Sequence, residues 1–201
     1  MNILRSDSYP LRRRAVVAAL LRDRGDLLVV SGLGAPSWDV TAAGDHPLSF
    51  PLWGAMGGAV MVGLGLALAQ PTRRVLVITG DGELLMGLGA LATVALKQPR
   101  NLAVAVLDNE RYGETGMQAT HTAGPTDLAA VAAAAGIPEA ASVYDQDALD
   151  EALPRLRRGD GPVLVAIKVR AEELPPVLPP KDGAHLKERF RRALLGPDSE
   201  G

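Results

Sequence analysis

"GDGELLMGLGALATVALKQPRNLAVAVLDNERYG", residues 80–113, is the stretch that decides the fold. It begins with a carboxylate, Asp81, between two glycines, and it ends with an Asp-Asn pair, closed by Asn109, and an aromatic loop. Two very apolar segments separate these polar ends. Asp81 and Asn109 therefore either meet in space or belong to unrelated turns, and the pattern of the surrounding chain decides between the two.

Four short runs of Val, Leu and Ile occur along the chain, and none of them alternates polar with apolar residues. Such runs are typical of strands buried on both faces of a parallel sheet. The runs lie at 27–30, 75–79, 102–107 and 163–167. Helix-like segments alternate with them, at 53–70, 83–97, 126–135 and 145–158. This order predicts an α/β fold, with three layers in which a parallel sheet is covered by helices.

Two helices have clear signals of their own. In 145–158 an apolar face follows Asp145, a predicted N-cap, and contains Pro154, which should kink the helix or end it early. That face consists of Leu149, Ala152, Leu153 and Leu156. An amphipathic surface helix is predicted after the three arginines at 12–14, which are expected to lie opposite its apolar face. Its apolar residues are Val16, Val17, Leu20 and Leu21.

The 201 residues suit one domain of ordinary size, 1–201, and no linker divides it. A proline-rich segment at 171–183 is expected to be extended, and a short basic helix is expected near 184–195. Together they form a predicted C-terminal arm of about 171–201.

Composition excludes several classes of function. A net charge of −2 argues against a nucleic-acid-binding protein. The apolar segment 54–69 is shorter than the roughly 20 residues that a membrane span needs. We therefore expect it to form a buried helix, and we expect no association with a membrane. The chain has no cysteine, which removes disulfides, thiolate metal sites and iron–sulfur clusters within it and fits a cytoplasmic protein.

The predicted sheet answers the question about the two polar ends. Ligands of open parallel sheets lie at the carboxyl ends of the strands. Asp81 directly follows one predicted strand and Asn109 another. We therefore expect both side chains to face one crevice.

The chemistry of these residues suits a phosphate with a cation. Gly80 and Gly82 let the backbone approach a ligand closely, and a helix that starts at Glu83 offers free N–H groups to a phosphate. A carboxylate beside a phosphate requires a cation between them. Mg²⁺ fits, because it takes oxygen ligands from Asp81, from Asn109 and from a backbone carbonyl of the following loop.

The spacing resembles a known family motif. Gly80-Asp81-Gly82 followed by 26 residues and Asn109 is similar to the motif of thiamine-diphosphate enzymes. The segment 53–58, Trp-Gly-Ala-Met-Gly-Gly, resembles the part that lies against the aminopyrimidine of the cofactor. The loop 109–118 resembles that of the decarboxylases of sulfopyruvate and phosphonopyruvate. The resemblance covers roughly residues 25–170 and implies a thiamine-diphosphate-binding fold.

The resemblance implies a role for individual residues. Mg²⁺ would be bound by the side chains of Asp81 and Asn109 and by the Arg111 carbonyl. The Gly54 carbonyl would accept a hydrogen bond from the 4′-amino group, and Met56 would wedge between the two rings, with plain core packing as the alternative for Met56. The diphosphate would be held by Gly80, Gly82, Glu83, Tyr112, Gly113 and Glu114. The turn at 31–34 is a weaker candidate for the same task.

A partner is also implied. In this family the catalytic glutamate belongs to a separate pyrimidine-binding domain, and the cofactor lies between the two domains. Glu83, Glu110 and Glu114 are expected on the wrong side to replace it. The resemblance therefore implies a split enzyme, a hetero-oligomer in which an alpha-type, pyrimidine-binding subunit supplies the glutamate.

Other polar side chains are weaker candidates for contact with a small 2-oxo acid substrate. His121, with Glu114, is the candidate catalytic residue, and a surface loop is the alternative for His121. His46 is a further candidate. Thr115, Gln118 and Thr120 are expected to orient the substrate carboxylate.

These observations together predict the diphosphate-binding subunit of a thiamine-diphosphate-dependent 2-oxo acid decarboxylase, a carbon–carbon lyase that releases an aldehyde. Two alternatives remain. One is a subunit of an aldehyde or 2-oxo acid oxidoreductase that passes the same intermediate to an oxidant, and the other is a cofactor-binding module without catalysis. A nucleotide-binding domain is disfavoured, because the chain has no P-loop motif.

Overall fold

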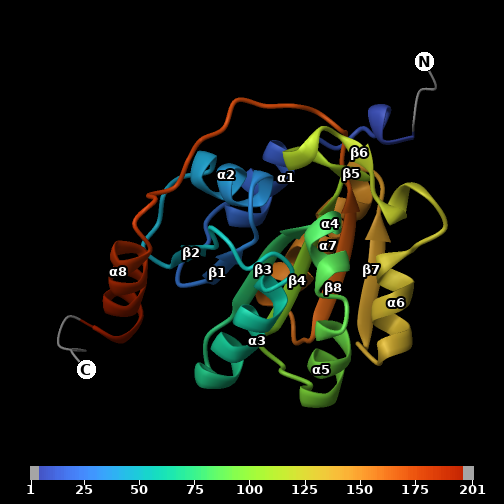
Figure 1. Cartoon of the computed structure of the whole chain (residues 1–201). Coiled ribbons are helices and arrows are strands. Elements are labelled where there is room, and N and C mark those ends of the chain that lie inside the picture. The colour runs from blue at the N-terminus through green and yellow to red at the C-terminus, as the bar shows by residue number, and fades with distance from the viewer. Residues whose placement is uncertain (1–4, 197–201) are drawn as a thin grey trace.

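A six-stranded parallel sheet forms the centre of the protein (Figure 1). The computed structural model describes residues 5–196. The strand order is β2-β1-β3-β4-β8-β7, and every neighbouring pair is parallel. The strands are β1 (Leu28–Ser31), β2 (Ser49–Pro51), β3 (Val75–Gly80), β4 (Leu102–Asp108), β7 (Glu139–Val143) and β8 (Val163–Lys168).

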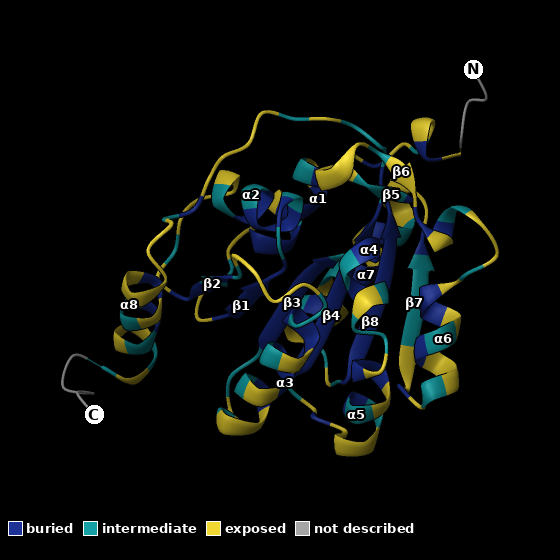
Figure 2. Cartoon of the chain, in the orientation of Figure 1, coloured by how far each residue is buried: buried dark blue, intermediate teal, exposed yellow. Residues whose placement is uncertain are grey.

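Helices cover both faces of the sheet. One face packs against α3 (Ala59–Ala69), α5 (Ala90–Lys97) and α6 (Leu128–Ala135). The other packs against α1 (Arg13–Leu21), α2 (Ala35–Ala42) and α7 (Gln146–Arg158). Successive strand residues alternate between the two cores, so the central strands are buried on both sides, as Figure 2 shows. The predicted three-layer α/β fold is confirmed.

The sequence missed the two edge strands and α2. β7 is mostly half-exposed and β2 has three residues, so neither has the apolar run that identifies a central strand. α2 has the sequence APSWDVTA, which carries almost no apolar periodicity, and it begins after Gly34 at φ +73°. A two-stranded hairpin, β5 (Arg111–Tyr112) with β6 (Gln118–Ala119), was not predicted either.

Two predicted helices have other bounds. The segment 83–97 forms two helices, α4 (Asp81–Met86) and α5, so the first begins before Glu83. The helix is interrupted at Gly87, where an added Cβ would stand 2.0 Å from the carbonyl oxygen of Gly57. The helix expected at 53–70 begins only at Ala59, because Ala55 and Gly57 have φ values of +55° and +85° that cannot continue a right-handed helix.

Two expectations about single residues on the helices need correction. Of the two outcomes expected at Pro154, a kink or an early end, the early end is wrong, since the helix continues to Arg158. Pro154 is exposed, so water can reach the carbonyl whose hydrogen bond it removes. The arginines of α1 are not all opposite its apolar face: Arg13 is buried and forms an ion pair with Asp39, which is fully buried. The predicted N-cap Asp145 is confirmed, because its side chain accepts from the Ala148 amide.

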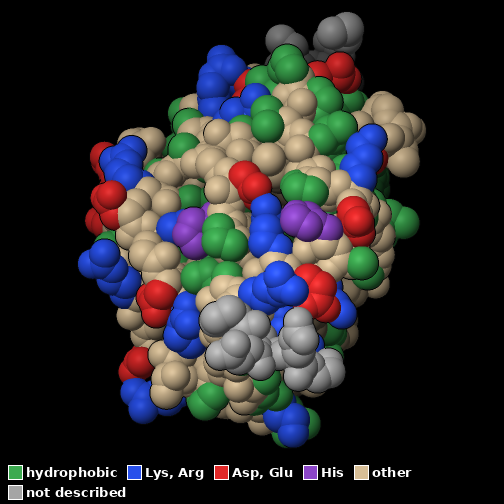
Figure 3. Space-filling model, turned by 90° about the vertical axis from the view of Figure 1, so that its left-hand side faces the viewer, with side chains coloured by type: hydrophobic (Ala, Val, Ile, Leu, Met, Phe, Trp, Pro, Cys, Tyr) green, Lys and Arg blue, Asp and Glu red, His purple; other side chains and the backbone are tan. Residues whose placement is uncertain are grey.

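An extended segment after β8 crosses the carboxyl edge of the sheet and leads to α8 (Gly183–Leu195) (Figure 1). α8 lies beside β2, where the rings of Phe190 and Phe50 are 5.4 Å apart and Arg189 pairs with Asp45 at 2.6 Å. Its outer surface mixes basic and acidic side chains (Figure 3). None of the helices within residues 5–196 is long and apolar enough to span a membrane.

Candidate functional site

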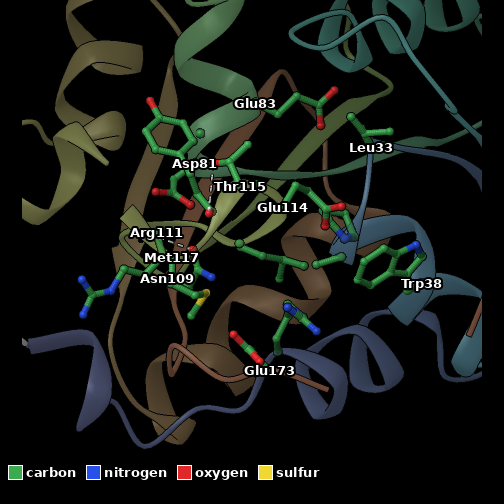
Figure 4. A pocket seen from close by; sticks show the side chains of 18 of the residues that line it. Leu33, Trp38, Asp81, Glu83, Asn109, Arg111, Glu114, Thr115, Met117 and Glu173 are labelled. Carbon is green, nitrogen blue, oxygen red and sulfur yellow. Dashed lines mark hydrogen bonds between the residues drawn. The ribbon is translucent and has the colours of Figure 1, made fainter. Parts of the chain in front are cut away.

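A change of direction in the sheet creates the site. From β1 the chain crosses to β2 on one side, and it then returns to β3 on the other side of β1. The loops that leave the carboxyl ends of β1 and β3 therefore diverge and leave a crevice. A cavity of about 420 Å³ lies there (Figure 4). Its walls are the turn after β1, the start of α4, the loop after β4, and residues 172–174.

Asp81 forms one wall of this cavity. Gly80 is level with Leu107 in the pairing of β3 with β4, so Asp81 stands at the tip of its strand. Its side chain is buried, and one oxygen, Oδ2, accepts from the hydroxyls of Thr120 at 2.6 Å and Thr122 at 3.0 Å. Burial, reinforced by the charge of Asp108, raises the pKa of Asp81 to about 7, although the two threonines oppose this shift. The site therefore disfavours the charged carboxylate until a cation compensates it.

Asn109 lies at the tip of the neighbouring strand β4 and lines the same cavity. Its Oδ1 accepts from the Arg111 amide at 3.0 Å, which holds the turn. Figure 4 shows Asp81 and Asn109 on the same side of the cavity, while the Arg111 guanidinium extends away toward Asp7, 3.4 Å distant. The fold thus brings together the residues of the two polar ends, which the sequence predicted to share a crevice.

The two glycines beside Asp81 have different surroundings. At Gly82 an added Cβ would lie 2.6 Å from the Tyr112 ring, so only glycine lets the loop after β4 pack on the start of α4. At Gly80, which lines the cavity, an added Cβ would meet nothing within 4 Å. Tyr112 and Gly113 also line the cavity.

Met56 stands at the mouth of the cavity. Its side chain is 61% exposed, which rules out the alternative that it is an ordinary core residue. It lines the cavity together with Met86, the last residue of α4. Gly54 lies in the same exposed turn as Met56 but is not among the lining residues.

Two glutamates extend over the turn after β1. The Glu83 carboxylate accepts from the Thr79 hydroxyl at 2.7 Å and lies so close to Gly32 that an added Cβ would be 1.5 Å from its Oε2. Burial raises the pKa of Glu83. Glu114 lies in the same way over Gly34, where an added Cβ would be 2.4 Å from the Glu114 Oε1. Both glutamates line the cavity.

The remaining candidates lie elsewhere. His121 is exposed and is not among the residues that line the cavity. His46 is also absent from the lining, and its Nδ1 accepts from the Leu48 amide. Thr115 lines the cavity and donates to Gln118, whereas the buried Thr120 binds Asp81 and so supports that carboxylate instead of facing a substrate.

The sequence did not indicate the wall opposite Asp81. This wall contains Trp38 and Glu173, which Figure 4 places across the cavity, and the buried Arg13. Arg13 and Glu173 come from opposite ends of the chain, and no local pattern links them. Lys168, the last residue of β8, was missed as well. It is buried beside Asp108 and Glu110, but in the sequence it is only one more residue after an apolar run.

The comparisons with known proteins agree with this geometry. Residues 37–167 match the family described as thiamine pyrophosphate enzyme, C-terminal TPP binding domain. The chain belongs to this family. Thiamine diphosphate is therefore its cofactor, and the oxygen donors at the strand tips fit the Mg²⁺ that accompanies it. Carboxylate, amide and backbone carbonyl oxygens are hard donors of the kind that Mg²⁺ prefers, and the raised pKa of Asp81 is that of a buried carboxylate beside a second acidic side chain, Asp108.

Individual relatives place the chain more closely. It is 40% identical to a phosphonopyruvate decarboxylase of Streptomyces viridochromogenes over 96% of this chain, but it spans only 48% of that protein. It is 39% identical to the sulfopyruvate decarboxylase subunit beta of Methanothermobacter thermautotrophicus, over 85% of this chain and 89% of that subunit. Benzoylformate decarboxylase from Polynucleobacter necessarius shares the fold, with a TM-score of 0.64 at 21% identity over 88% of this chain and 36% of that one.

Proposed function

We propose that this chain is the diphosphate- and metal-binding subunit of a thiamine-diphosphate-dependent 2-oxo acid decarboxylase. The observation that carries the proposal is the cavity at the tips of β3 and β4, lined by Asp81 and Asn109, in a chain that belongs to the thiamine pyrophosphate enzyme family. Its similarity to decarboxylases that act on sulfopyruvate and phosphonopyruvate supports the reaction and the class of substrate.

Asp81, Asn109 and the Arg111 carbonyl are the proposed Mg²⁺ ligands. Thr120 and Thr122 both bind Oδ2 of Asp81, which leaves Oδ1 for the cation. The Asn109 oxygen already accepts one hydrogen bond from the Arg111 amide and has a second lone pair for the metal. One negative charge and two neutral oxygens suit a cation whose remaining ligands come from phosphate and water.

The diphosphate is proposed to lie over Gly80, Gly82 and Glu83 and along residues 112–114. The open space at Gly80 and the presence of Tyr112 and Gly113 in the lining of the cavity support this position. Met56 is proposed to support the bent cofactor from the mouth of the cavity, and the Gly54 carbonyl to accept from its amino group.

Bound thiamine diphosphate supplies the nucleophile and the electron sink that the loss of CO₂ from a 2-oxo acid requires. The chain's own residues bind and orient. Asp81 and Asn109 anchor the charged end, Met56 fixes the ring end, and Leu33, Trp38 and Met86 supply apolar walls that exclude water from the cavity.

A second subunit is proposed to supply the catalytic glutamate and the rest of the substrate pocket. Within the chain, Glu110 is unsuited to the task, because it is buried and its carboxylate is bound by Arg5, Tyr9 and Lys168. Glu83 and Glu114 are turned onto the glycines of the turn after β1. The sulfopyruvate decarboxylase relative of similar length is named a beta subunit, and the phosphonopyruvate decarboxylase relative is about twice as long.

The test combines cofactor binding with turnover. The full chain is assayed alone and together with a co-expressed pyrimidine-binding chain from the same genome, with sulfopyruvate and phosphonopyruvate as substrates. We expect aldehyde and CO₂ only from the mixture. Asp81→Ala should abolish Mg²⁺-dependent binding of thiamine diphosphate in calorimetry and lower turnover at least a hundredfold, since it removes the charged metal ligand. Asp147→Ala, on the exposed side of α7, is the matched control.

Three results would contradict the proposal in different ways. Full turnover by the chain alone would remove the need for a partner. Unchanged cofactor affinity in Asp81→Ala would remove the metal site. An acyl product in place of an aldehyde, formed only with an added oxidant, would favour the oxidoreductase alternative.

A further inference from the structure

A buried group of charges lies directly behind the turn that carries Asn109. Lys168, the last residue of β8, is paired with Asp108 in the register of β4 with β8. Its ammonium lies 2.8 Å from Asp108 Oδ2 and 3.3 Å from Glu110 Oε1. All three side chains are less than a tenth exposed. The two carboxylates flank Asn109 on either side in the sequence, so one cation holds both ends of this turn.

The turn needs such a restraint. Glu110 has φ +59°, a left-handed conformation that an ordinary side chain adopts only when its surroundings enforce it. The Glu110 carboxylate accepts from Tyr9 at 2.8 Å and from Arg5 at 3.0 Å. The Glu110 amide donates to Asp108, and its carbonyl accepts from the Thr120 amide. The side chain of Glu110 thus acts as an anchor that points away from the cavity while Asn109 faces into it.

The balance of charge makes Lys168 the central member of this group. Asp81, Asp108 and Glu110 are three carboxylates with about 1% exposure each, and Thr122 hydrogen-bonds to both aspartates. The only other cation that contacts them among the described residues is Arg5, which is 61% exposed. Burial disfavours the Lys168 ammonium, but Asp108 and Glu110 outweigh this effect and raise its pKa. Loss of the ammonium would leave two buried carboxylates to repel each other across Asn109.

We propose that Lys168 is a positioning residue that neutralises Asp108 and Glu110 and thereby holds Asn109 and the Arg111 carbonyl toward Asp81. Lys168 touches neither the cavity nor, by this placement, a bound cofactor. The positioning is a property of the chain alone, whereas its use for binding a metal rests on the proposed function.

Hydrogen exchange tests the positioning without any ligand. In the full chain, Lys168→Met keeps the apolar stem and removes the charge. We expect the amides of residues 109–113 to exchange at least tenfold faster than in the wild type, with the amides of α6 unchanged. Lys168→Arg should keep the exchange within threefold of wild type, because it keeps the charge. Lys97→Met, at the exposed end of α5, is the matched control.

A second variant separates charge from packing. Adding Glu110→Gln to Lys168→Met removes the repulsion and keeps a side chain that Tyr9 and Arg5 can bind. We expect exchange to return at least halfway toward wild type, which a packing role for Lys168 would not produce. If Lys168→Met does not fold, Tyr9→Phe tests the same anchor by removing one donor to Glu110, with an expected threefold increase in exchange at 109–113.

Binding of Mn²⁺ in the presence of thiamine diphosphate, measured by electron paramagnetic resonance on the chain with its partner, links the turn to the metal. We expect Lys168→Met to weaken the binding of Mn²⁺ at least tenfold, and Lys168→Arg to bind Mn²⁺ like the wild type. Unchanged exchange in Lys168→Met, or no recovery in the double variant, would overturn the positioning role. If exchange changes as expected but the wild type binds no Mn²⁺, the proposed function fails and the positioning role stands.

Discussion

At the scale of single residues, Asp81 combines a strand tip, a buried position and two threonine donors. The sequence predicted that Asp81 and Asn109 face the same crevice, from their places directly after two apolar runs. It assigned no structural role to Thr122, Glu110 or Lys168, which shape the surroundings of these two residues. Each of the three lies on a different segment, and only the packed fold brings their charges and hydroxyls together.

Asp81→Asn should change how stability depends on pH in the absence of metal. The folded pKa of about 7 lies above the ordinary value of 3.8, so the native state binds this proton more tightly than the unfolded chain does. The free energy of unfolding of the wild type should therefore fall as the pH rises from about 4 to about 7, by on the order of 2–4 kcal/mol, and then level off. The asparagine should remove most of this loss.

Urea denaturation with EDTA at pH 5 and pH 8 measures the effect. Asp81→Asn should be more stable than wild type at pH 8, and the difference should be less than half as large at pH 5, where most of the Asp81 side chain is still protonated in the folded state. Glu151→Gln, on the exposed part of α7, serves as the control and should follow the wild type at both values. If wild type gained stability relative to Asp81→Asn between pH 5 and pH 8, burial would not disfavour the charged form of Asp81, and the prediction would be wrong.

At the scale of elements, the contact between two glycine turns positions the mouth of the cavity. Gly57 and Gly87 pack backbone against backbone, which places Met56 beside Met86. The sequence showed one continuous helix at 83–97 because its apolar residues keep a helical period on both sides of the break. Only the approach of the Gly57 segment decides that the helix divides there.

Gly87→Ala should destabilise the protein by about 2–3 kcal/mol, because the added methyl group would stand 2.0 Å from the Gly57 carbonyl oxygen and the backbone must move. Gly89→Ala is the matched control, since its added Cβ meets nothing within 4 Å and its φ of −59° is already helical. We expect the control to change stability by no more than about 1 kcal/mol in either direction. Thermal and urea denaturation of both variants make the comparison, and equal effects would refute the close packing.

At the scale of the whole molecule, the two ends of the chain complete the cavity. The segment after β8 pairs with the start of the chain through hydrogen bonds from Arg170 to Leu11 and from Ala171 to Ser6. It then lays Glu173 against the cavity and continues to α8. The beginning of the predicted extended segment at 171–183, residues 172–174, thus forms a wall of the site, a role that the proline content of the segment did not reveal.

Phe190→Ala should release α8 while the sheet stays folded. Phe190 is one of the two buried side chains of the helix, with its ring against Phe50, and a truncated aromatic in such a contact costs about 3 kcal/mol. Amides of residues 183–195 should exchange at least tenfold faster, with β3 and β4 unchanged. Leu195→Ala, at an exposed position of the same helix, is the control. A concerted loss of protection in α8 and the sheet would mean that the helix is part of the central folding unit.

The sequence by itself determined the layered α/β fold and the placement of Asp81 and Asn109 at one cavity, because apolar runs identify buried strands and parallel strands end at one edge. It also determined the family, through glycines and polar residues at fixed spacing. The tertiary structure alone decided the edge strands, the division of α4 from α5, the burial of Arg13 with Asp39, and the group of charges around Lys168. These features depend on contacts between distant segments, and the energy of a buried charge or a close backbone contact is set by its neighbours in space, which local pattern does not encode.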